Sequence, residues 1–380
     1  MTSAPAGSHT LPPHAPQNGT IALHRAGPRD DDVHTGTAYA ERVRRGEAVR
    51  LRRGVYTSAQ SWKDAAPWQR HAAAVAATAL QHPTGIFCRE SALLLHSVPL
   101  LHTPAAVHLR TYDRTVVGTR PAPPPFGRSP GPSARETVPD GVPTRLIEPA
   151  RYKGHRRDEL RRRIGDGEWE NPSTSLPAET LPGISGVERP YHVEPLGLAA
   201  ADTVPRLTVT DAVVILDSLL AGRCRGGPWN MAQLRRWETH ISSTRLMNRW
   251  SQALALADAR AESVGESVLR IRMHQLGFQP PALQSLISTG ERTYRVDFEW
   301  REAGVVVEFD GRVKYRTPRA DSPGVPDAGV GSAPEQTVWA KKLREDAIRS
   351  TGRRVVRVVW SDLVDRSRLE RLLLAAGIPR

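Results

Sequence analysis

The chain has 380 residues, which is enough for two or three domains with separate hydrophobic cores. Its 53 Lys and Arg outnumber its 40 Asp and Glu, and the formal net charge of +13 favours nucleic acid as a partner, although GC-rich codon usage also enriches arginine. Cys88 and Cys224 lie far apart, which argues against a disulfide scaffold or zinc site. Without a signal-peptide or membrane-spanning apolar run, we expect a cytoplasmic protein with no membrane contact.

The first third of the chain begins with a segment of low structural propensity. Residues 1–33 are rich in Pro, His, Gly and Asp and are predicted to form a disordered lead. Residues 34–115 are predicted to form a small α+β region, because short helical and strand patterns alternate there. Gly54 is expected to turn the chain between two of these strands.

The middle of the chain changes character near residue 116. Residues 116–190 are interrupted by proline, which removes backbone donors, so this part is predicted to be a Pro-rich linker or a set of long loops. Residues 191–250 are predicted to be a helical middle segment, with helices at 207–220 and 231–250.

Residues 251–380 have the clearest pattern and are predicted to be one domain. A helix is expected from about Trp250 to Gly277, followed by strands at 283–288, around Asp297 and at 305–310. After a loop at 317–334, we expect a helix at 338–350, a strand at 355–360 and a helix at 366–376. This order predicts an α/β fold, with a mixed sheet flanked by helices on both faces.

Three acidic residues stand at the ends of two of these strands. Asp297 closes one strand, and Glu308 and Asp310 close the next, where residues two apart share a face. If the strands pair as a hairpin, the three carboxylates approach each other and offer the oxygen ligands that Mg²⁺ prefers. Such a cation can polarise a phosphodiester and activate water. The alternative is an ordinary acidic hairpin on a protein surface.

The run VDFEW…VVVEFDG…EDAIRSTGRRVVRVVW resembles the restriction-endonuclease-like, or PD-(D/E)XK, superfamily. It is most similar to the domain of unknown function related to very-short-patch-repair endonucleases, over about 250–380. The resemblance implies a Mg²⁺- or Mn²⁺-dependent endonuclease with Asp297 and Glu308 as metal ligands, helped by Asp310 or Glu266. Asp310 stands where the superfamily usually has a catalytic lysine. Lys314 would reach back in its place, or else is a solvated loop residue.

Two helices of this domain carry further candidates. Glu266 belongs to the helix that often contributes an acidic side chain in this fold, and the alternative is an ion pair with Arg270. Asp346 and Arg349 match the helix motif of the resemblance, and the alternative is a local ion pair. A basic set would either follow a DNA backbone or form a solvated face: Lys341, Lys342, Arg344, Arg349, Arg353 and Arg354.

The N-terminal runs RRGEAVRLRRGVYTSA and IFCRESALLLHSVPLL resemble the N-terminal region of abortive-infection type IV antitoxins. That family pairs a winged helix with a small α/β module, so the resemblance implies an α+β winged-helix-like region here, and a toxin protein as a partner. Five arginines would lie on its last helix and wing, where they would contact DNA phosphates: Arg44, Arg45, Arg50, Arg52 and Arg53.

Two functions from different classes follow from these observations. The first is a DNA-binding protein whose metal-dependent endonuclease-like domain hydrolyses phosphodiesters in defence or DNA processing. The second is a non-catalytic, antitoxin-like transcriptional regulator with a degenerate nuclease fold. A third alternative is a structural relic of the fold that does not contact nucleic acid.

Overall fold

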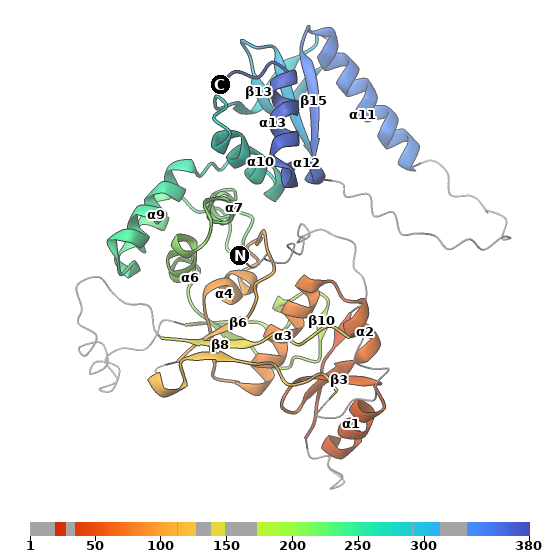
Figure 1. Cartoon of the computed structure of the whole chain (residues 1–380), viewed down its shortest axis with the longest axis vertical. Coiled ribbons are helices and arrows are strands. Elements are labelled where there is room, and N and C mark those ends of the chain that lie inside the picture. The colour runs from red at the N-terminus through yellow and green to blue at the C-terminus, as the bar shows by residue number, and fades with distance from the viewer. Residues whose placement is uncertain are drawn as a thin grey trace, which may run out of the picture. The chain divides into compact units, whose positions relative to one another are not determined.

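The structure is a computed structural model that describes residues 20–27, 35–111, 113–126, 138–148, 173–290, 292–311 and 333–380, with side chains described from residue 342 in the last range. The chain divides into two compact units, Met1–Ala257 and Asp258–Arg380, each containing helices and sheet (Figure 1). The α/β class expected from the sequence is confirmed. Within the described ranges, no helix has the length and apolar character needed to cross a lipid bilayer.

A small antiparallel sheet opens the first unit. Its middle strand β4 (Val55–Ser58) pairs with β2 (His24–Arg25) on one side and β3 (Ala48–Arg52) on the other. Gly54 makes the turn between β3 and β4 at φ +74°, a backbone conformation that glycine adopts without steric cost. The strand, turn and strand predicted here are therefore confirmed. Helices α1 (Thr35–Arg44), α2 (Ala59–Asp64) and α3 (Pro67–Gln81) contact this sheet.

In the described residues, six strands form the larger sheet of the first unit. It is mixed, since β6 pairs parallel with β8 and antiparallel with β5. Helix α4 (Arg89–Leu95) contacts β6, and α3 also lies against that strand. In their order across the sheet, the strands are β7 (Gly118–Arg120), β8 (Thr144–Ile147), β6 (Val107–Arg110), β5 (Ile86–Phe87), β11 (Tyr191–Val193) and β9 (Thr174–Leu176).

The region 116–190 is more than the linker or long loops predicted for it. It supplies β7, β8 and β9 to the larger sheet, and β10 (Ile184–Ser185), which pairs with β1 (Ile21–Ala22). Strand β8 is an inner strand that begins directly after Pro143, a position at which the missing proline N–H costs the sheet nothing. Residues 191–250 likewise begin with a sheet strand, β11, before they become helical.

The helical part of the first unit follows β11. Its most apolar helix is α7 (Val209–Leu220), which is capped by the Thr208 hydroxyl and contacts α9 (Thr244–Leu256). Trp250 of α9 is fully buried, together with Ala253 and Leu254 of the same helix. The remaining helices in the described part of this unit are α6 (Leu196–Thr203), α8 (Met231–Arg235) and the 3₁₀ turns η1 (Arg114–Val116), η3 (Ala178–Thr180), η4 (Val204–Arg206) and η5 (Glu238–His240).

The second unit is built on a four-stranded mixed sheet. Strands β12 (Ala282–Ser288), β13 (Thr293–Trp300) and β14 (Val305–Asp310) form an antiparallel meander. Strand β15 (Arg354–Val359) then adds parallel to β14, with Glu308 opposite Arg357. The order of helices and strands predicted for this part of the chain is confirmed as far as β15, but a short helix from Trp360 to Val364, which was not predicted, precedes the final helix.

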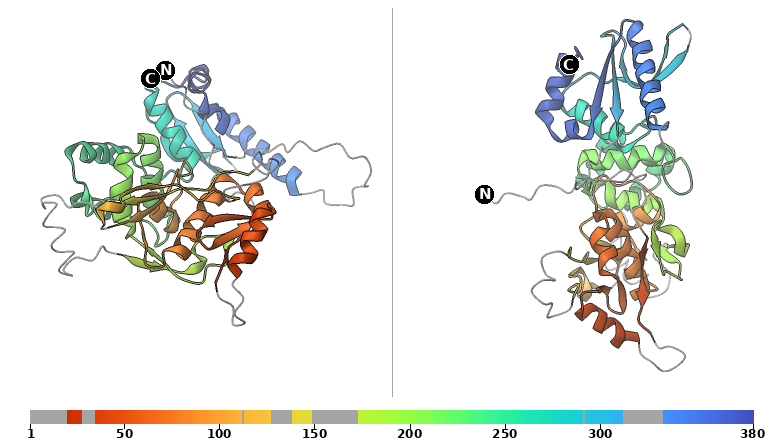
Figure 2. Two further views of the ribbon diagram at one scale, coloured as in Figure 1. Left: turned by 60° about the horizontal axis from the view of Figure 1, so that its bottom comes forward. Right: turned by 90° about the vertical axis from the view of Figure 1, so that its right-hand side faces the viewer.

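Helices cover both faces of this sheet. Helix α11 (Ala333–Ser350) lies on one face, and α12 (Trp360–Val364) and α13 (Arg366–Ala375) lie on the other (Figures 1 and 2). Ile348 of α11 packs with Ile287, Val296 and Val306 of the sheet. Helix α10 (Val264–Gln275) contacts α12 and β14.

The single helix predicted from Trp250 to Gly277 is wrong. Helix α9 ends at Leu256, because Ala257 adopts an extended backbone, and α10 begins only at Val264. The Ser263 side chain accepts a hydrogen bond from the Glu266 N–H and so starts the new helix. The boundary between the two compact units falls in this break.

Candidate functional site

The predicted acidic residues meet beside the end of β14 in the second unit. Glu308 and Asp310 lie at the end of this strand, whereas Asp297 lies within β13 and does not close it as predicted, because β13 continues to Trp300. They line a pocket of about 170 Å³ together with Phe309, Arg344 of α11 and Arg357 of β15. The hairpin geometry expected from the sequence therefore brings all three carboxylates to the same pocket.

Asp297 is fixed by the neighbouring strand. Its carboxylate accepts a hydrogen bond of 2.8 Å from the backbone N–H of Phe309. Burial raises the pKa of this carboxyl above its ordinary value, and the Phe309 N–H and Arg344 only partly counter that effect. Asp297 therefore carries a charge that its surroundings compensate incompletely.

Glu308 is paired with an arginine from across the pocket. Arg344 donates to the Glu308 carboxylate at 2.6 Å and to the carbonyl oxygen of Arg295 at 2.5 Å. Burial nevertheless raises the pKa of Glu308, with Arg344 lowering it and Asp297 raising it. The Arg344 guanidinium thus places a positive charge beside the carboxylates of Glu308 and Asp297.

A second set of charges borders the pocket on the side of α11. Glu345 accepts from Arg349 at 2.6 Å and from Arg357 at 2.7 Å, which orients Arg357 toward the pocket. Arg349 therefore forms a local ion pair, as one of the two alternatives predicted, but its partner is Glu345 and not Asp346. Lys342 is exposed on the same helix, whereas the side chain of Lys341 lies outside the described residues.

Glu266 stands at the first turn of α10 and is 8 % exposed. Its carboxylate accepts from the Glu262 N–H at 2.9 Å and from the Gln284 side chain at 3.0 Å. Burial raises its pKa, and the charge of Asp297 adds to this rise. Glu266 is thus electrostatically coupled to the acidic pocket, although it does not line it.

The position of α10 beside the pocket depends on Gly265. A Cβ atom at this position would lie 1.8 Å from the Phe309 ring, so only glycine permits the contact. Phe309 also packs edge-on against Trp360, with ring centroids 5.3 Å apart. These contacts place the first turn of α10 against the end of β14.

The carboxylates do not form a ready-made metal cage. Among the residues that the structure describes, no group of three or more His, Cys, Asp or Glu side chains is arranged to hold a metal ion. Lys314, which would replace the expected catalytic lysine, lies outside the described residues. A bound Mg²⁺ or Mn²⁺ therefore stays a prediction from the chemistry of the pocket.

Two arginines that line this pocket, and one glutamine that contacts Glu266, were not identified as site residues from the sequence. Arg344 was placed only in the general basic set, and Arg357 was not considered because it belongs to an apolar strand. The register of β14 with β15, which sets Glu308 opposite Arg357, is the signal that identifies it. Gln284 was also missed, and its φ of +52° is a strained conformation for a residue with a side chain.

The five N-terminal arginines do not form one exposed surface. Arg44 and Arg45 are exposed and pair with Glu41, and Arg53 is exposed beside the turn between β3 and β4. Arg50 is half-buried in β3. These four residues therefore differ in how far they are open to a phosphate.

Arg52 is a correction to the expected DNA-contacting set. It is only 4 % exposed, and it donates to the Thr78 hydroxyl at 2.9 Å and to the Leu51 carbonyl at 2.8 Å. Burial lowers its pKa to about 10. Strand β3 turns this side chain toward α3, so it is withdrawn from the surface where a phosphate would lie.

Comparison with models of protein families, with curated proteins and with solved structures gives no match to this chain.

Proposed function

We propose that the second unit is a metal-dependent endonuclease-like domain that binds DNA and hydrolyses its phosphodiesters. The observation that carries this proposal is the pocket beside the end of β14, at the point where its pairing with β13 stops, which Asp297, Glu308 and Asp310 line together. Support also comes from the order of elements: one helix, three antiparallel strands, a helix and a parallel fourth strand. That order agrees with the restriction-endonuclease-like arrangement that the sequence resembles.

The donor chemistry of the pocket suits a hard divalent cation. Asp297 and Glu308 are half-buried carboxylates whose pKa values are raised by burial, an effect that Arg344 only partly offsets. Carboxylate oxygens are the ligands that Mg²⁺ and Mn²⁺ prefer, so Asp297, Glu308 and Asp310 are the residues that would hold such an ion. When bound, the ion supplies the positive charge that polarises a phosphodiester and lowers the pKa of a water molecule.

The arginines of the pocket have a distinct role in this proposal. Arg344 holds Glu308 in this structure, and Glu308 would have to share its carboxylate between Arg344 and a bound cation. Arg344 and Arg357 then remain beside the pocket as positive groups that can stabilise charge developing on a phosphate. Arg344 of α11 and Arg357 of β15 thus offer the positive charge that a catalytic lysine usually supplies in the superfamily. The exposed Lys342 and Arg349 would contact the DNA backbone from α11.

A cleavage assay on the full chain tests the function. We expect single- or double-stranded DNA to be cut in Mg²⁺ or Mn²⁺ and to stay intact in EDTA. Asp297→Asn and Glu308→Gln should each abolish cutting. Glu302→Gln, which neutralises an exposed carboxyl in the turn before β14, should leave it unchanged. Cutting that survives Asp297→Asn would show that this pocket is not responsible.

A second function is favoured by the ion pair of Glu308 with Arg344, because that pair already neutralises one of the proposed metal ligands. In this case the chain is a non-catalytic, antitoxin-like regulator that binds DNA through exposed arginines of the first unit and has a toxin as a partner protein. A gel shift with DNA from upstream of its own gene addresses it. Binding without metal that is lost in the Arg44→Ala, Arg45→Ala, Arg53→Ala triple variant, but kept in Arg120→Ala, would favour the regulator.

A further inference from the structure

The first unit contains a second pocket, remote from the acidic site in the chain, that has the opposite charge. Its volume is about 370 Å³, within the range of about 300–1,000 Å³ typical of small-molecule sites. Strands β7 and β8 form one side, and the first residue of α4, the end of β6, α6 and η4 contribute charged side chains. Four arginines line it: Arg89, Arg110, Arg145 and Arg206.

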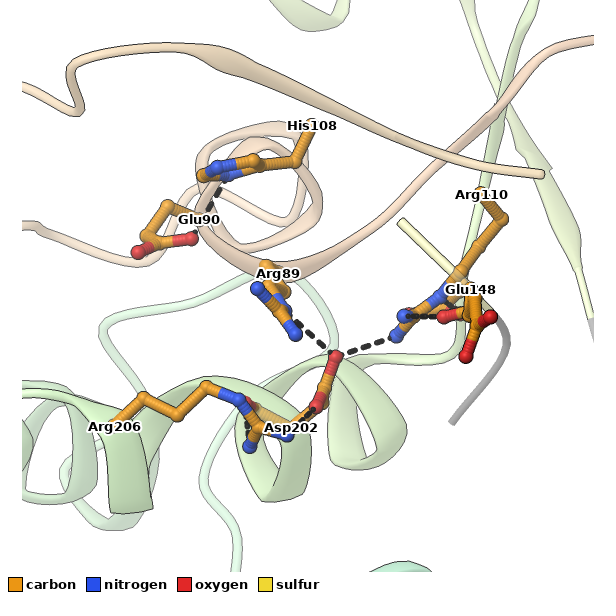
Figure 3. A network of polar contacts seen from close by, with 8 residues as sticks. Arg89, Glu90, His108, Arg110, Glu148, Asp202 and Arg206 are labelled. Carbon is orange, nitrogen blue, oxygen red and sulfur yellow. Dashed lines mark hydrogen bonds and ion pairs between the residues drawn. The ribbon is translucent and has the colours of Figure 1, made fainter. Parts of the chain in front are cut away.

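Asp202 organises three of these arginines around one point. Its carboxylate accepts from Arg89 at 2.9 Å, from Arg110 at 2.7 Å and from Arg206 at 3.0 Å. Figure 3 shows Asp202 between the three guanidiniums, which come from different directions. Arg110 is additionally held by a fully buried ion pair with Glu194. The guanidiniums are therefore prepositioned by Asp202 in the lining and, for Arg110, by Glu194 outside it, as a binding site requires.

The charges that line this pocket do not balance. The lining holds four guanidiniums and the carboxylates of Asp202 and Glu148, and Glu194 behind it pairs with Arg110, so that four positive groups face three negative ones. His240 adds no charge near pH 7, because burial lowers its pKa to about 4. Burial also lowers the pKa of Arg206 despite its contact with Asp202, as expected where positive charge is incompletely compensated. A phosphate monoester carries about −1.5 to −2 charges at this pH and would offset the excess.

Two further features distinguish this pocket from an ordinary network of surface ion pairs. Arg89 has a φ of +49°, a left-handed conformation that is costly for a residue with a side chain and is found preferentially at functional sites. Arg145 is exposed on β8, and no ion pair or side-chain hydrogen bond joins it to the rest of the described residues. Its guanidinium is therefore available to a ligand, and Ser242 adds a hydroxyl at the same pocket.

We propose that this pocket binds the phosphate group of a small phosphorylated ligand about the size of a mononucleotide, through Arg89, Arg145 and Arg206. Guanidiniums match phosphate because their N–H groups can bind two of its oxygens at once. Arg110 and Asp202 are positioning residues, since their interactions hold the other arginines in place. This site goes beyond the endonuclease-like function, because it belongs to the other unit and needs no metal.

Calorimetric titration of the full chain in EDTA tests the proposal independently of nuclease activity. The probes are inorganic phosphate, adenosine 5′-monophosphate, adenosine and a 5′-phosphorylated oligonucleotide, all at matched ionic strength. We expect the monophosphate to bind and adenosine not to bind, while inorganic phosphate competes with the monophosphate. The proposal would be overturned if adenosine bound as tightly as the monophosphate, or if neither inorganic phosphate nor the monophosphate bound. Binding of the oligonucleotide alone would also overturn it.

Matched variants locate the binding to the pocket. Arg145→Gln removes an exposed guanidinium that is outside the Asp202 network, so it should preserve the fold while weakening monophosphate binding at least tenfold. Arg206→Gln should weaken it similarly. Arg120→Gln on the adjacent strand β7 is the control, because Arg120 is exposed and does not line the pocket. Unchanged affinity in Arg145→Gln, in a protein with a wild-type circular dichroism spectrum, would contradict the assignment.

Discussion

At the scale of single residues, Asp297 lies where its own charge is disfavoured. The folded protein raises its pKa above the ordinary value of 3.8, so the folded state binds its proton more tightly than the unfolded state does. The resulting loss of stability is absent in acid and develops as the pH rises through the folded pKa. A carboxylate kept at such a cost is typical of functional sites.

Asp297→Asn should therefore stabilise the second unit at pH 7. The asparagine oxygen can still accept the Phe309 N–H, while the buried charge is removed. We expect the melting temperature of the variant to exceed that of the wild type at pH 7, and the difference to disappear near pH 3. Scanning calorimetry at both pH values measures it, and a lower melting temperature at pH 7 would contradict this account of Asp297.

Arg344 should control the protonation of the same pocket. Its charge lowers the pKa of both Glu308 and Asp297, against the effect of burial. In Arg344→Met, both pKa values should therefore rise further, which a carbon-13 NMR titration of the side-chain carboxyls can follow. Arg349→Met is the matched control, because Arg349 pairs with Glu345. Equal shifts in the two variants would rule out a specific role for Arg344.

At the scale of elements, the acidic pocket depends on how closely α10 approaches β14. Gly265→Ala would set a methyl group 1.8 Å from the Phe309 ring, so the helix or the ring has to move. We expect a loss of about 1–3 kcal/mol in the free energy of unfolding of the second unit, as for other overpacked cores. Hydrogen exchange of peptides from β13 and β14 measures this loss.

Gly311→Ala provides the control for that variant. Its Cβ would lie 3.5 Å from the same ring, which is ordinary contact distance, and it should change stability much less. If both alanine variants have the same exchange rates as the wild type, the close approach of α10 does not stabilise this end of the sheet.

The ion pairs of Arg110 join the larger sheet of the first unit to its helices. Arg110 of β6 is buried with Glu194 and Asp202, and its removal leaves two carboxylates without this partner. Arg110→Met should cost about 3–5 kcal/mol of unfolding free energy, the range for one half of a buried pair. Arg114→Met, which breaks a more exposed pair with Glu148, should cost about 1 kcal/mol or less. Similar costs for the two variants, measured by urea unfolding, would contradict this.

At the scale of the whole molecule, the elements of the second unit were predictable because their patterns are local. Strand β13 follows from alternating apolar residues, β14 from three consecutive valines after a turn at Gly304, and β15 from a further valine-rich run. The break between α9 and α10 was not predictable from periodicity, because apolar residues continue through it. It depends instead on the Ser263 cap and on where the two units separate.

The sites were predictable only where their residues are close in sequence. Glu308 and Asp310 share one strand end, and Asp297 is one hairpin away, so their approach follows from local pairing. Arg344 reaches Glu308 across 36 positions, and Arg89 reaches Asp202 across 113, so only the assembled fold brings these pairs together. The basic pocket of the first unit therefore had no signal in the sequence. The burial of Arg52 depends in the same way on the packing of α3 against β3.

The central claim is that the pocket of Asp297, Glu308 and Asp310 takes up a divalent cation. Its most direct test is a titration of the full chain with Mn²⁺, in which free Mn²⁺ is followed by electron paramagnetic resonance. The wild type and Glu302→Gln should each bind one ion that excess Mg²⁺ displaces, and Asp297→Asn should lose that site. No binding at millimolar Mn²⁺, or the same binding in Asp297→Asn, would contradict the claim.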